Sequence, residues 1–381
     1  MTKTKSKKYE HVFWYLDKNM KKLWGYRYRY YDALGNRREK AKQSFTTEVD
    51  AYRKLLEIQT QVVNGDTKRV ENSNLTVSEW LNIWYETHQI EWSISSQIQR
   101  RRAIELQMKP LLGKFKLGEL DKNTYKRKYL NVLQEHYKPS TVKLYHRLFK
   151  IAVNAAVDDE IIPRNRFGKM TLTDEEINDN FLAAHELREF LNAAKHFENV
   201  TNYTFIYLLA YTGLRRGEAQ GLQWRDISFD TKMLSVERTR DKNGVRKPKT
   251  KRSRRALLLD DLIIHHLKVY RTWCKKTKLY FGRQLKEDDF IFISHQSGKP
   301  IGDNTIKYSF ERLFKETGIK RITPHGLRHT HATLLIMDRI PTVVVAARLG
   351  NTPAMIDNVY GHVLKNVEEE SVHSFAKIMN Q

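Results

Sequence analysis

The stretch TPHGLRHTHATLL, residues 323–335, places three histidines and one arginine near the start of a predicted helix. A threonine cap and a following proline set the helix start, so His325, Arg328 and His329 share one helix face. The spacing of the two histidines allows a metal pair, but the glutamate of an H-E-x-x-H motif and a clear third ligand are missing. Arg328 would repel a divalent cation and attract a phosphate. We therefore predict half of a phosphate-binding site and no metal, with His329 and His331 as packing or supporting residues.

Three other stretches carry residues that could act on a phosphate. In TGLRRGEAQGLQW, Arg215 lies at a predicted helix entrance, where backbone N–H groups and the dipole favour an anion. Glu218, three residues later, can hold its guanidinium. In KPKTKRSRRALLL the lysines lie on a predicted β-hairpin, from which one could donate a proton to a substrate. In RLGNTPAMIDNVYGHV, Tyr360 lies near the end of a predicted helix. Taken singly, these stretches favour a surface ion pair, solvated lysines and a packed tyrosine.

The charge balance points to a polyanionic partner. The chain has 381 residues with 68 Lys plus Arg against 44 Asp plus Glu, a formal net charge of +24, and a sequence pI of about 9.8. Nucleic acid is the expected partner of such a surface, and a generally basic protein is the alternative. The single cysteine, Cys274, excludes an internal disulfide and a Cys-based zinc site and suits a reducing cytosol. We expect a cytoplasmic, nucleoid-associated protein.

The pattern along the chain predicts a multidomain α+β fold with three parts. Residues 1–66 read as a small three-stranded sheet plus one helix, followed by a polar linker at 64–74. Residues 75–168 read as a bundle of four helices with a basic exterior. Residues 175–381 read as a larger, mainly α-helical domain with a small antiparallel sheet. A polar, acidic stretch at 171–180 marks the boundary before it.

Basic residues in the first two parts are candidates for DNA contacts. Around residues 24–30, aromatic residues fall on one side of a period-2 strand and arginines on the other. A three-stranded sheet can enter the major groove, whereas the aromatics are expected to form the small core. The candidate DNA-binding residues are Arg27 and Arg29 in the sheet, and Arg101, Lys143 and Arg147 on the helices.

The four stretches occur in the order Arg…Lys…H-x-x-R…Tyr, and this order and spacing resemble the tyrosine recombinase (phage integrase) family. The helical segment is similar to the family's core-binding domain. The N-terminal sheet is similar to the arm-binding domain of temperate-phage and conjugative-transposon integrases. The resemblance assigns catalytic roles to Arg215, Lys249 (with Lys251 as a weaker candidate), His325, Arg328 and Tyr360, and supporting roles to Glu218 and Asn351.

The resemblance implies a site-specific integrase that cleaves and rejoins DNA through a covalent 3′-phosphotyrosine. Two arginines would stabilise charge on the phosphate oxygens, Tyr360 would be the nucleophile and Lys249 would protonate the leaving 5′ oxygen. No cofactor, metal or ATP is expected. The implied partners are double-stranded DNA at core and arm sites and three further copies in a homotetramer. An excisionase and a host DNA-bending protein are candidate further partners.

Asn351 departs from the family pattern, which has histidine or tryptophan nine residues before the tyrosine. An asparagine can donate a hydrogen bond to a phosphate but cannot carry a proton, which keeps a non-catalytic DNA-binding regulator as the alternative. A metal-dependent nuclease and a topoisomerase are further alternatives. A predicted helix with an apolar stripe in residues 363–378 would dock on its own domain or on a neighbouring subunit.

Overall fold

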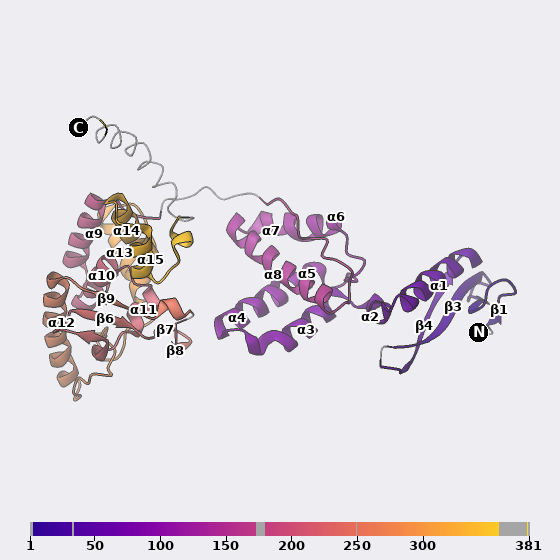
Figure 1. Cartoon of the computed structure of the whole chain (residues 1–381), viewed down its shortest axis with the longest axis horizontal. Helices are drawn as coiled ribbons and strands as arrows, with labels where there is room; N and C mark the ends of the chain where they lie inside the picture. Colours follow the sequence, from indigo (N-terminus) through magenta and orange to yellow (C-terminus); the bar gives the residue numbers. More distant parts are fainter. Residues whose placement is uncertain (1–2, 33, 173–179, 249, 358–378, 380–381) are drawn as a thin grey trace. The chain divides into compact units, whose positions relative to one another are not determined.

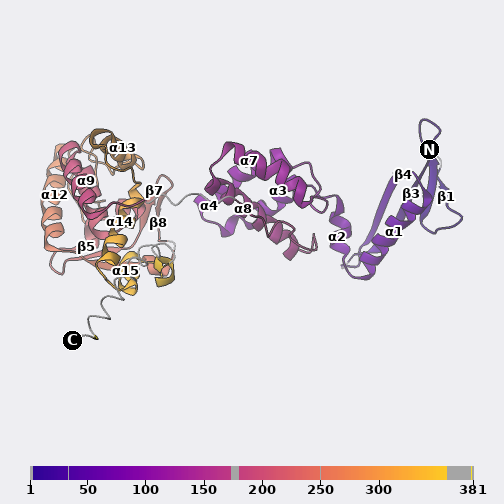
Figure 2. The ribbon, with the colours of Figure 1, turned by 90° about the horizontal axis from the view of Figure 1, so that it is seen from above.

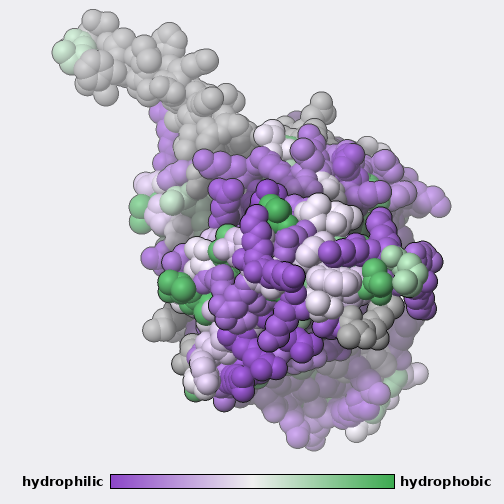
Figure 3. All heavy atoms as spheres, turned by 90° about the vertical axis from the view of Figure 1, so that its right-hand side faces the viewer, coloured by the Kyte–Doolittle hydropathy of each residue, from purple (hydrophilic) through white to green (hydrophobic). Residues whose placement is uncertain are grey.

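The computed structural model describes residues 3–32, 34–172, 180–248, 250–357 and 379. The chain divides into two compact units, residues 1–177 and 178–381, which are described separately (Figure 1, Figure 2). Within the described residues, no helix combines the length and the apolar character that crossing a membrane requires. The face turned to the viewer in Figure 3 is mostly hydrophilic, with hydrophobic residues only scattered over it.

The first unit begins with an antiparallel sheet of four strands rather than the predicted three. The strands pair in the order β1-β2-β3-β4. The additional strand, β1, has only two residues, too few for a period-2 pattern to reveal it. The strands are β1 (Thr4–Lys5), β2 (Val12–Leu16), β3 (Lys22–Tyr31) and β4 (Arg37–Phe45).

Helix α1 (Glu48–Val63) lies against one face of this sheet, as Figure 1 shows. Its N-cap is Thr47, whose side chain accepts from the Asp50 N–H. Tyr26 and Tyr30 are buried in the core below α1, while Arg27 and Arg29 are exposed on the opposite face. The prediction that aromatics and arginines separate onto two faces is confirmed.

The polar stretch predicted as a linker is helical. It forms α2 (Thr67–Glu71) and a 3₁₀ turn, η1 (Asn72–Asn74). Val70 in α2 is 0% exposed and belongs to the same small core as the sheet and α1. A single apolar residue in a run of eleven is too weak a pattern to indicate a helix, and its burial supplies the missing stabilisation.

Four helical segments, called rods below, follow in the chain, and two of them contain a π-helical turn. Trp80 of α3 is 1% exposed, and its indole N–H donates to the Ala152 carbonyl of α8 at 2.8 Å. That bond joins the first and last rods across a core of aromatic and aliphatic residues. The rods are α3 (Val77–His88), α4–η3–α5 (Ile94–Ala103, Ile104–Met108, Lys109–Leu112), α6–η4–α7 (Lys122–Tyr125, Lys126–Leu130, Asn131–His136) and α8 (Pro139–Asp158).

The second unit is built around α10 (Val200–Thr212), which is apolar on all sides and largely buried. It contacts α9 (Ala184–Phe197), α12 (Asp261–Tyr280), α13 (Thr305–Thr317) and α14 (Pro324–Met337). The short helix α11 (Arg216–Gly221) follows it directly, and α15 (Thr342–Leu349) packs on α14.

Two small antiparallel sheets complete this unit, one of three strands in the order β5-β6-β9 and one hairpin. The mixed, mainly helical fold class predicted from the sequence is therefore confirmed. The strands are β5 (Ile227–Ser228), β6 (Met233–Val236), β7 (Thr239–Asp241), β8 (Gly244–Arg246) and β9 (Arg255–Leu258).

Replacing Val70 by Asp should destabilise the N-terminal part, because it would bury a carboxylate without a partner. We expect the free energy of unfolding to fall by roughly 3–5 kcal/mol, the usual cost of an uncompensated buried charge. Val63→Asp is the control, since Val63 is 81% exposed at the end of α1. Chemical denaturation of both variants measures the difference, and equal stability would show that α2 is not part of the core.

Candidate active site

The first arginine lies where two helices meet, as predicted. Helix α10 ends at Gly213, which adopts φ 64° in the left-handed region. A side chain there would be strained and would also collide, since a Cβ would lie 2.5 Å from Leu349 Cδ2. Arg215 then caps α11, and its N–H donates to Glu218 Oε2 at 3.0 Å. The glycine therefore allows the chain to turn and present Arg215.

The Arg215 side chain is held at both terminal nitrogens. One donates to Glu218 Oε1 at 2.7 Å, and the other donates to Asn351 Oδ1 at 2.8 Å. The side chain is still 35% exposed. The predicted support by Glu218 is present, and Asn351 adds a second support from a distant part of the chain.

Glu218 is also held from its other side by Arg255. The Arg255 guanidinium donates to Glu218 Oε2 at 3.0 Å, and the two side chains are 6% and 4% exposed. Burial by itself raises the pKa of the Glu218 carboxyl, but the Arg255 charge, its hydrogen bond and the Arg215 contacts outweigh burial and lower the pKa. Glu218 is therefore a buried anion between two cations.

Arg255 and Arg348 were not predicted as site residues. Arg255 donates to the Arg348 carbonyl at 2.6 Å and to the Ser253 carbonyl at 3.1 Å. The period-2 pattern of β9 could have indicated its role, since it places Arg255 on the same side as the buried Leu257. An arginine on the inner side of a strand calls for a buried acidic partner.

The second arginine, Arg328, is 3% exposed. It donates to the Gly213 carbonyl at 2.9 Å and to the Leu349 carbonyl at 2.7 Å. These carbonyls end α10 and α15, where backbone acceptors have no partner within their helix. Arg328 therefore joins the two helix ends, and its guanidinium contacts the turn at Gly213, two residues before Arg215.

Asn351 follows a second left-handed glycine, Gly350, at φ 66°. A Cβ at Gly350 would lie 2.8 Å from the Arg252 carbonyl, so only glycine fits this position. Because an arginine can only donate, Asn351 Oδ1 must face Arg215. The amide NH₂ of Asn351 is then the donor end of a side chain that lines the cleft.

Histidines 325 and 329 contact each other edge to face, with ring centroids 4.8 Å apart. The His325 side chain is exposed, yet its pKa is lowered to about 4 by partial desolvation, followed by His329, Arg328 and Arg215. His325 is therefore neutral at pH 7. The described residues contain no group of three or more His, Cys, Asp or Glu arranged to hold a metal ion.

His331, interpreted from the sequence as a packing or supporting residue, makes two hydrogen bonds. Its Nδ1 bonds the Ala210 carbonyl at 3.0 Å and its Nε2 accepts from Arg348 Nε at 3.1 Å. Arg348 also donates to the Tyr211 and Leu258 carbonyls. The pair fastens α15 to the end of α10 and to β9.

A cleft of about 350 Å³ lies beside these residues. Arg215, Glu218 and Asn351 line it, together with Pro248 and Thr250. The predicted lysine, Lys249, lies between the last two but outside the described residues, as do Tyr360 and the predicted C-terminal helix. The alternative lysine, Lys251, begins the 3₁₀ turn η6 (Lys251–Ser253) beside the cleft.

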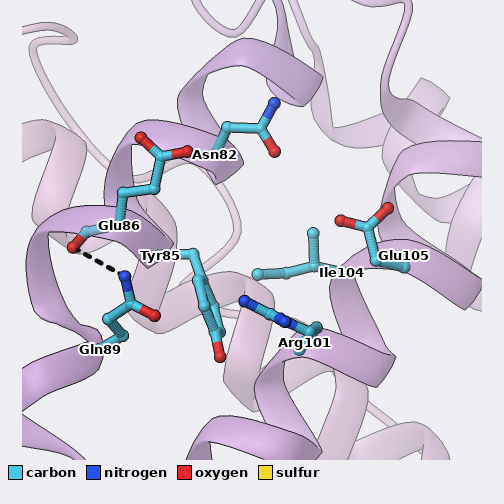
Figure 4. A pocket seen from close by; sticks show the side chains of 7 residues that line it. All are labelled: Asn82, Tyr85, Glu86, Gln89, Arg101, Ile104 and Glu105. Carbon is cyan, nitrogen blue, oxygen red and sulfur yellow. Dashed lines mark hydrogen bonds between the residues drawn. The ribbon is translucent and has the colours of Figure 1, made fainter.

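The candidate DNA-binding residues lie in the first unit. Arg101 lies over the ring of Tyr85 at 5.0 Å and lines a separate cleft of about 390 Å³ in which Glu86 and Glu105 also lie (Figure 4). Arg147 is exposed on α8 and, after burial, is the second cause that lowers the pKa of Arg100.

Lys143 is half-buried on α8, and Arg27 and Arg29 lie on the open face of the sheet. The DNA contacts of all five residues stay predictions.

Family models match three successive segments of the chain. The "Arm DNA-binding domain" matches residues 13–62, the "Phage integrase, N-terminal SAM-like domain" matches 76–133 and the "Phage integrase family" matches 180–366. The chain belongs to the phage integrase family. The three segments follow the same order as the predicted arm-binding, core-binding and catalytic domains.

Curated relatives of this integrase-family chain include recombinases and integrases. It is 29% identical over 273 residues to "Tyrosine recombinase XerC-like" of Caldanaerobacter subterraneus, covering 65% of this chain and 68% of that protein. It is 29% identical to the ICEBs1 integrase of Bacillus subtilis, covering 57% of this chain and 60% of that one. It is 22% identical to the integrase of Mycobacterium phage L5 over 89% and 91% of the two chains.

Solved integrase structures share the fold. The Tn1549 transposon integrase in complex with transposon right end DNA has a TM-score of 0.68 at 20% identity, covering 79% of this chain and all of that one (100%). A lambda integrase tetramer bound to a Holliday junction has a TM-score of 0.58 at 19% identity, covering 91% and 97%.

Replacing Arg255 by Leu should destabilise the second unit, because Glu218 would lose one of its two cations. We expect a loss of roughly 3–5 kcal/mol, typical of a broken buried ion pair. Arg254→Leu is a matched control, since Arg254 is 53% exposed and lies 3.5 Å from Glu237. Chemical denaturation measures both, and equal losses would contradict the buried role of Arg255.

Protonation of His331 should lower the free energy of unfolding as the pH is reduced below neutral. Desolvation, followed by Arg348, lowers the pKa of His331 from 6.5 to about 4, so between these values the unfolded chain binds more protons than the folded one. The contribution of His331 to the free energy of unfolding is therefore fully present above pH 6.5 and is lost as the pH falls to about 4. His331→Gln should reduce this slope in thermal unfolding, whereas His295→Gln, at an exposed histidine, should not. Identical slopes in all three proteins would contradict the assignment.

Proposed function

We propose that this tyrosine recombinase cuts and rejoins DNA strands at specific sites through a covalent 3′-phosphotyrosine, and thereby integrates a mobile element. The observation that carries the proposal is the fixed position of the Arg215 side chain. Its guanidinium is fixed by Glu218 and Asn351 at the edge of a cleft, and the buried Arg328 contacts the same turn. Fixed donors stabilise a phosphoryl transition state because they need not reorganise as charge develops.

The reaction would begin with attack of the Tyr360 hydroxyl oxygen on phosphorus. The new Tyr360–phosphate bond replaces the bond from phosphorus to the 5′ oxygen, so the number of phosphodiester-type bonds is unchanged and no ATP is needed. His325 would take the tyrosine proton or hydrogen-bond the phosphate, and Lys249 would donate a proton to the leaving 5′ oxygen. The reverse steps join a new 5′ end.

Three structural features support a role for Asn351 despite its departure from the family pattern. Its oxygen accepts a hydrogen bond from Arg215, its side chain lines the cleft, and Gly350 ends α15 in the left-handed conformation just before it. We propose that it binds a non-bridging phosphate oxygen and takes no part in proton transfer. This assigns it a supporting role in catalysis and argues against the non-catalytic regulator.

The proposed partners are DNA at core sites, DNA at arm sites and other copies of the chain. The core-binding helices and the N-terminal sheet would hold the two kinds of DNA site, and four copies would form the working assembly. A bacterial cytoplasm, at the nucleoid, is the proposed location. An excisionase and a host DNA-bending protein stay candidate partners.

A Tyr360→Phe protein should bind DNA with unchanged affinity but form no covalent adduct, because only the nucleophilic oxygen is lost. The measurement is incubation of both proteins with supercoiled plasmid, followed by denaturing gels that retain protein–DNA adducts. The unmodified protein should form adducts equally well in EDTA. Adducts with the Tyr360→Phe protein would refute the nucleophile. Loss of activity in EDTA would favour a metal-dependent nuclease, and no cleavage by the unmodified protein would favour the regulator.

A further inference from the structure

Glu39 lies between the two arginines on the open face of the N-terminal sheet. Its Oε1 is 3.2 Å from Arg27 Nε and its Oε2 is 2.9 Å from Arg29 Nε. One carboxylate therefore binds both cations, with one oxygen for each. All three side chains are accessible, with exposures of 38% for Glu39, 48% for Arg27 and 54% for Arg29.

The strand register produces this arrangement. Arg29 of β3 is directly opposite Glu39 of β4, and Arg27 is opposite Ala41. Directly opposed residues point to the same face, so Glu39 faces away from α1 together with both arginines. Tyr26 and Tyr30, at the alternate positions, are buried against α1.

The same face borders a hollow of about 710 Å³. Arg27, Arg29 and Arg37 line it together with Lys3 and Phe13, and the Lys3 ammonium lies 4.9 Å from the centre of the Phe13 ring. A surface lined by these cations suits DNA, in which guanidinium and ammonium groups meet phosphates and base edges.

Stability does not explain a carboxylate at the centre of this face. Exposed ion pairs contribute little to folding, and a negative charge weakens binding to any phosphate. The hydrogen bond from Arg29 is the first cause that lowers the pKa of Glu39, so the charge persists at neutral pH. Its effect is therefore on the geometry of the arginines.

That geometry favours the reading of bases. In both ion pairs the Nε of the arginine is the atom that meets Glu39, so the terminal NH₂ groups of each guanidinium are not the atoms that these two contacts use. A guanidinium that presents paired donors at a fixed angle matches O6 and N7 of guanine in the major groove. An unrestrained arginine would instead follow whichever phosphate lies nearest.

We infer that Glu39 determines specificity at arm-type DNA sites by holding Arg27 and Arg29 for guanine edges and by disfavouring phosphate contacts common to all sequences. The inference rests on the proposed binding of arm sites by this sheet, but not on the cleavage chemistry. Glu39 is thus a positioning residue whose removal should strengthen non-specific binding while weakening discrimination.

The experiment begins by finding the arm sequence with the full chain. A random duplex library is selected with the Tyr360→Phe protein, which cannot form adducts, and with the same protein carrying Arg27→Ala and Arg29→Ala. A motif that is enriched by the first protein but not by the protein lacking both arginines is the arm motif. We expect this motif to contain guanines. If no motif is lost, the inference is overturned.

Affinities for the arm motif and for a scrambled duplex are then compared across variants. Glu39→Gln should bind the scrambled duplex more tightly, with a salt slope steeper by about one, and its preference for the motif should fall about tenfold. Glu39→Asp keeps the charge but is too short to reach both arginines, so it should lose the preference without gaining non-specific affinity.

Glu57→Gln is the matched control, because it removes an equal charge from the exposed Lys54–Glu57 pair on α1. It should leave the preference unchanged. If Glu39→Gln and Glu39→Asp both keep the preference of the parent protein, Glu39 does not determine specificity. If Glu39→Gln fails to fold, Glu39→Asp alone decides. Adduct formation by the unmodified protein is a separate readout, so failure of the reaction and failure of this inference are distinguishable.

Discussion

The second unit depends on how buried guanidinium groups are compensated. Arg328 takes its acceptors from the carbonyl ends of α10 and α15, and Arg255 takes one from Arg348 and a charged one from Glu218. A guanidinium has five donors and no acceptor, so a single carboxylate could not satisfy it. Helix ends provide unpaired carbonyls in fixed positions. Arg255 is thus held in place by a carboxylate together with a carbonyl, and Arg328 is held by two helix-end carbonyls.

This arrangement also explains why two glycines flank the site. Gly213 and Gly350 end α10 and α15 in the left-handed conformation, which directs the last carbonyls of both helices to Arg328 and turns the chain toward Arg215 and Asn351. Their side-chain positions are filled by Leu349 and by the Arg252 backbone. Two helix terminations therefore determine the positions of the Arg215, Arg328 and Asn351 side chains, and the same termination signals made these stretches recognisable in the sequence.

The sequence was most informative where a residue lies next to a helix boundary. The caps, glycines and spacing around Arg215, Glu218 and Arg328 are local, and the structure has them as predicted. Arg255 and Arg348 could not be predicted as easily, because their partners are carbonyls from distant segments. The Glu39 contact depends on strand register, β1 is too short for a pattern, and α2 forms around one buried valine.

The link between Arg215 and Asn351 spans 136 positions in the chain. During synthesis, Arg215 therefore emerges from the ribosome long before the residue that orients it, and Arg328 reaches its second carbonyl only once Leu349 has been added. Long-range contacts of this kind form late in folding. An unfinished or prematurely terminated polypeptide consequently has the cations without their final arrangement. The timing of translation itself delays the final arrangement of Arg215 and Arg328 until Leu349 and Asn351 have been made.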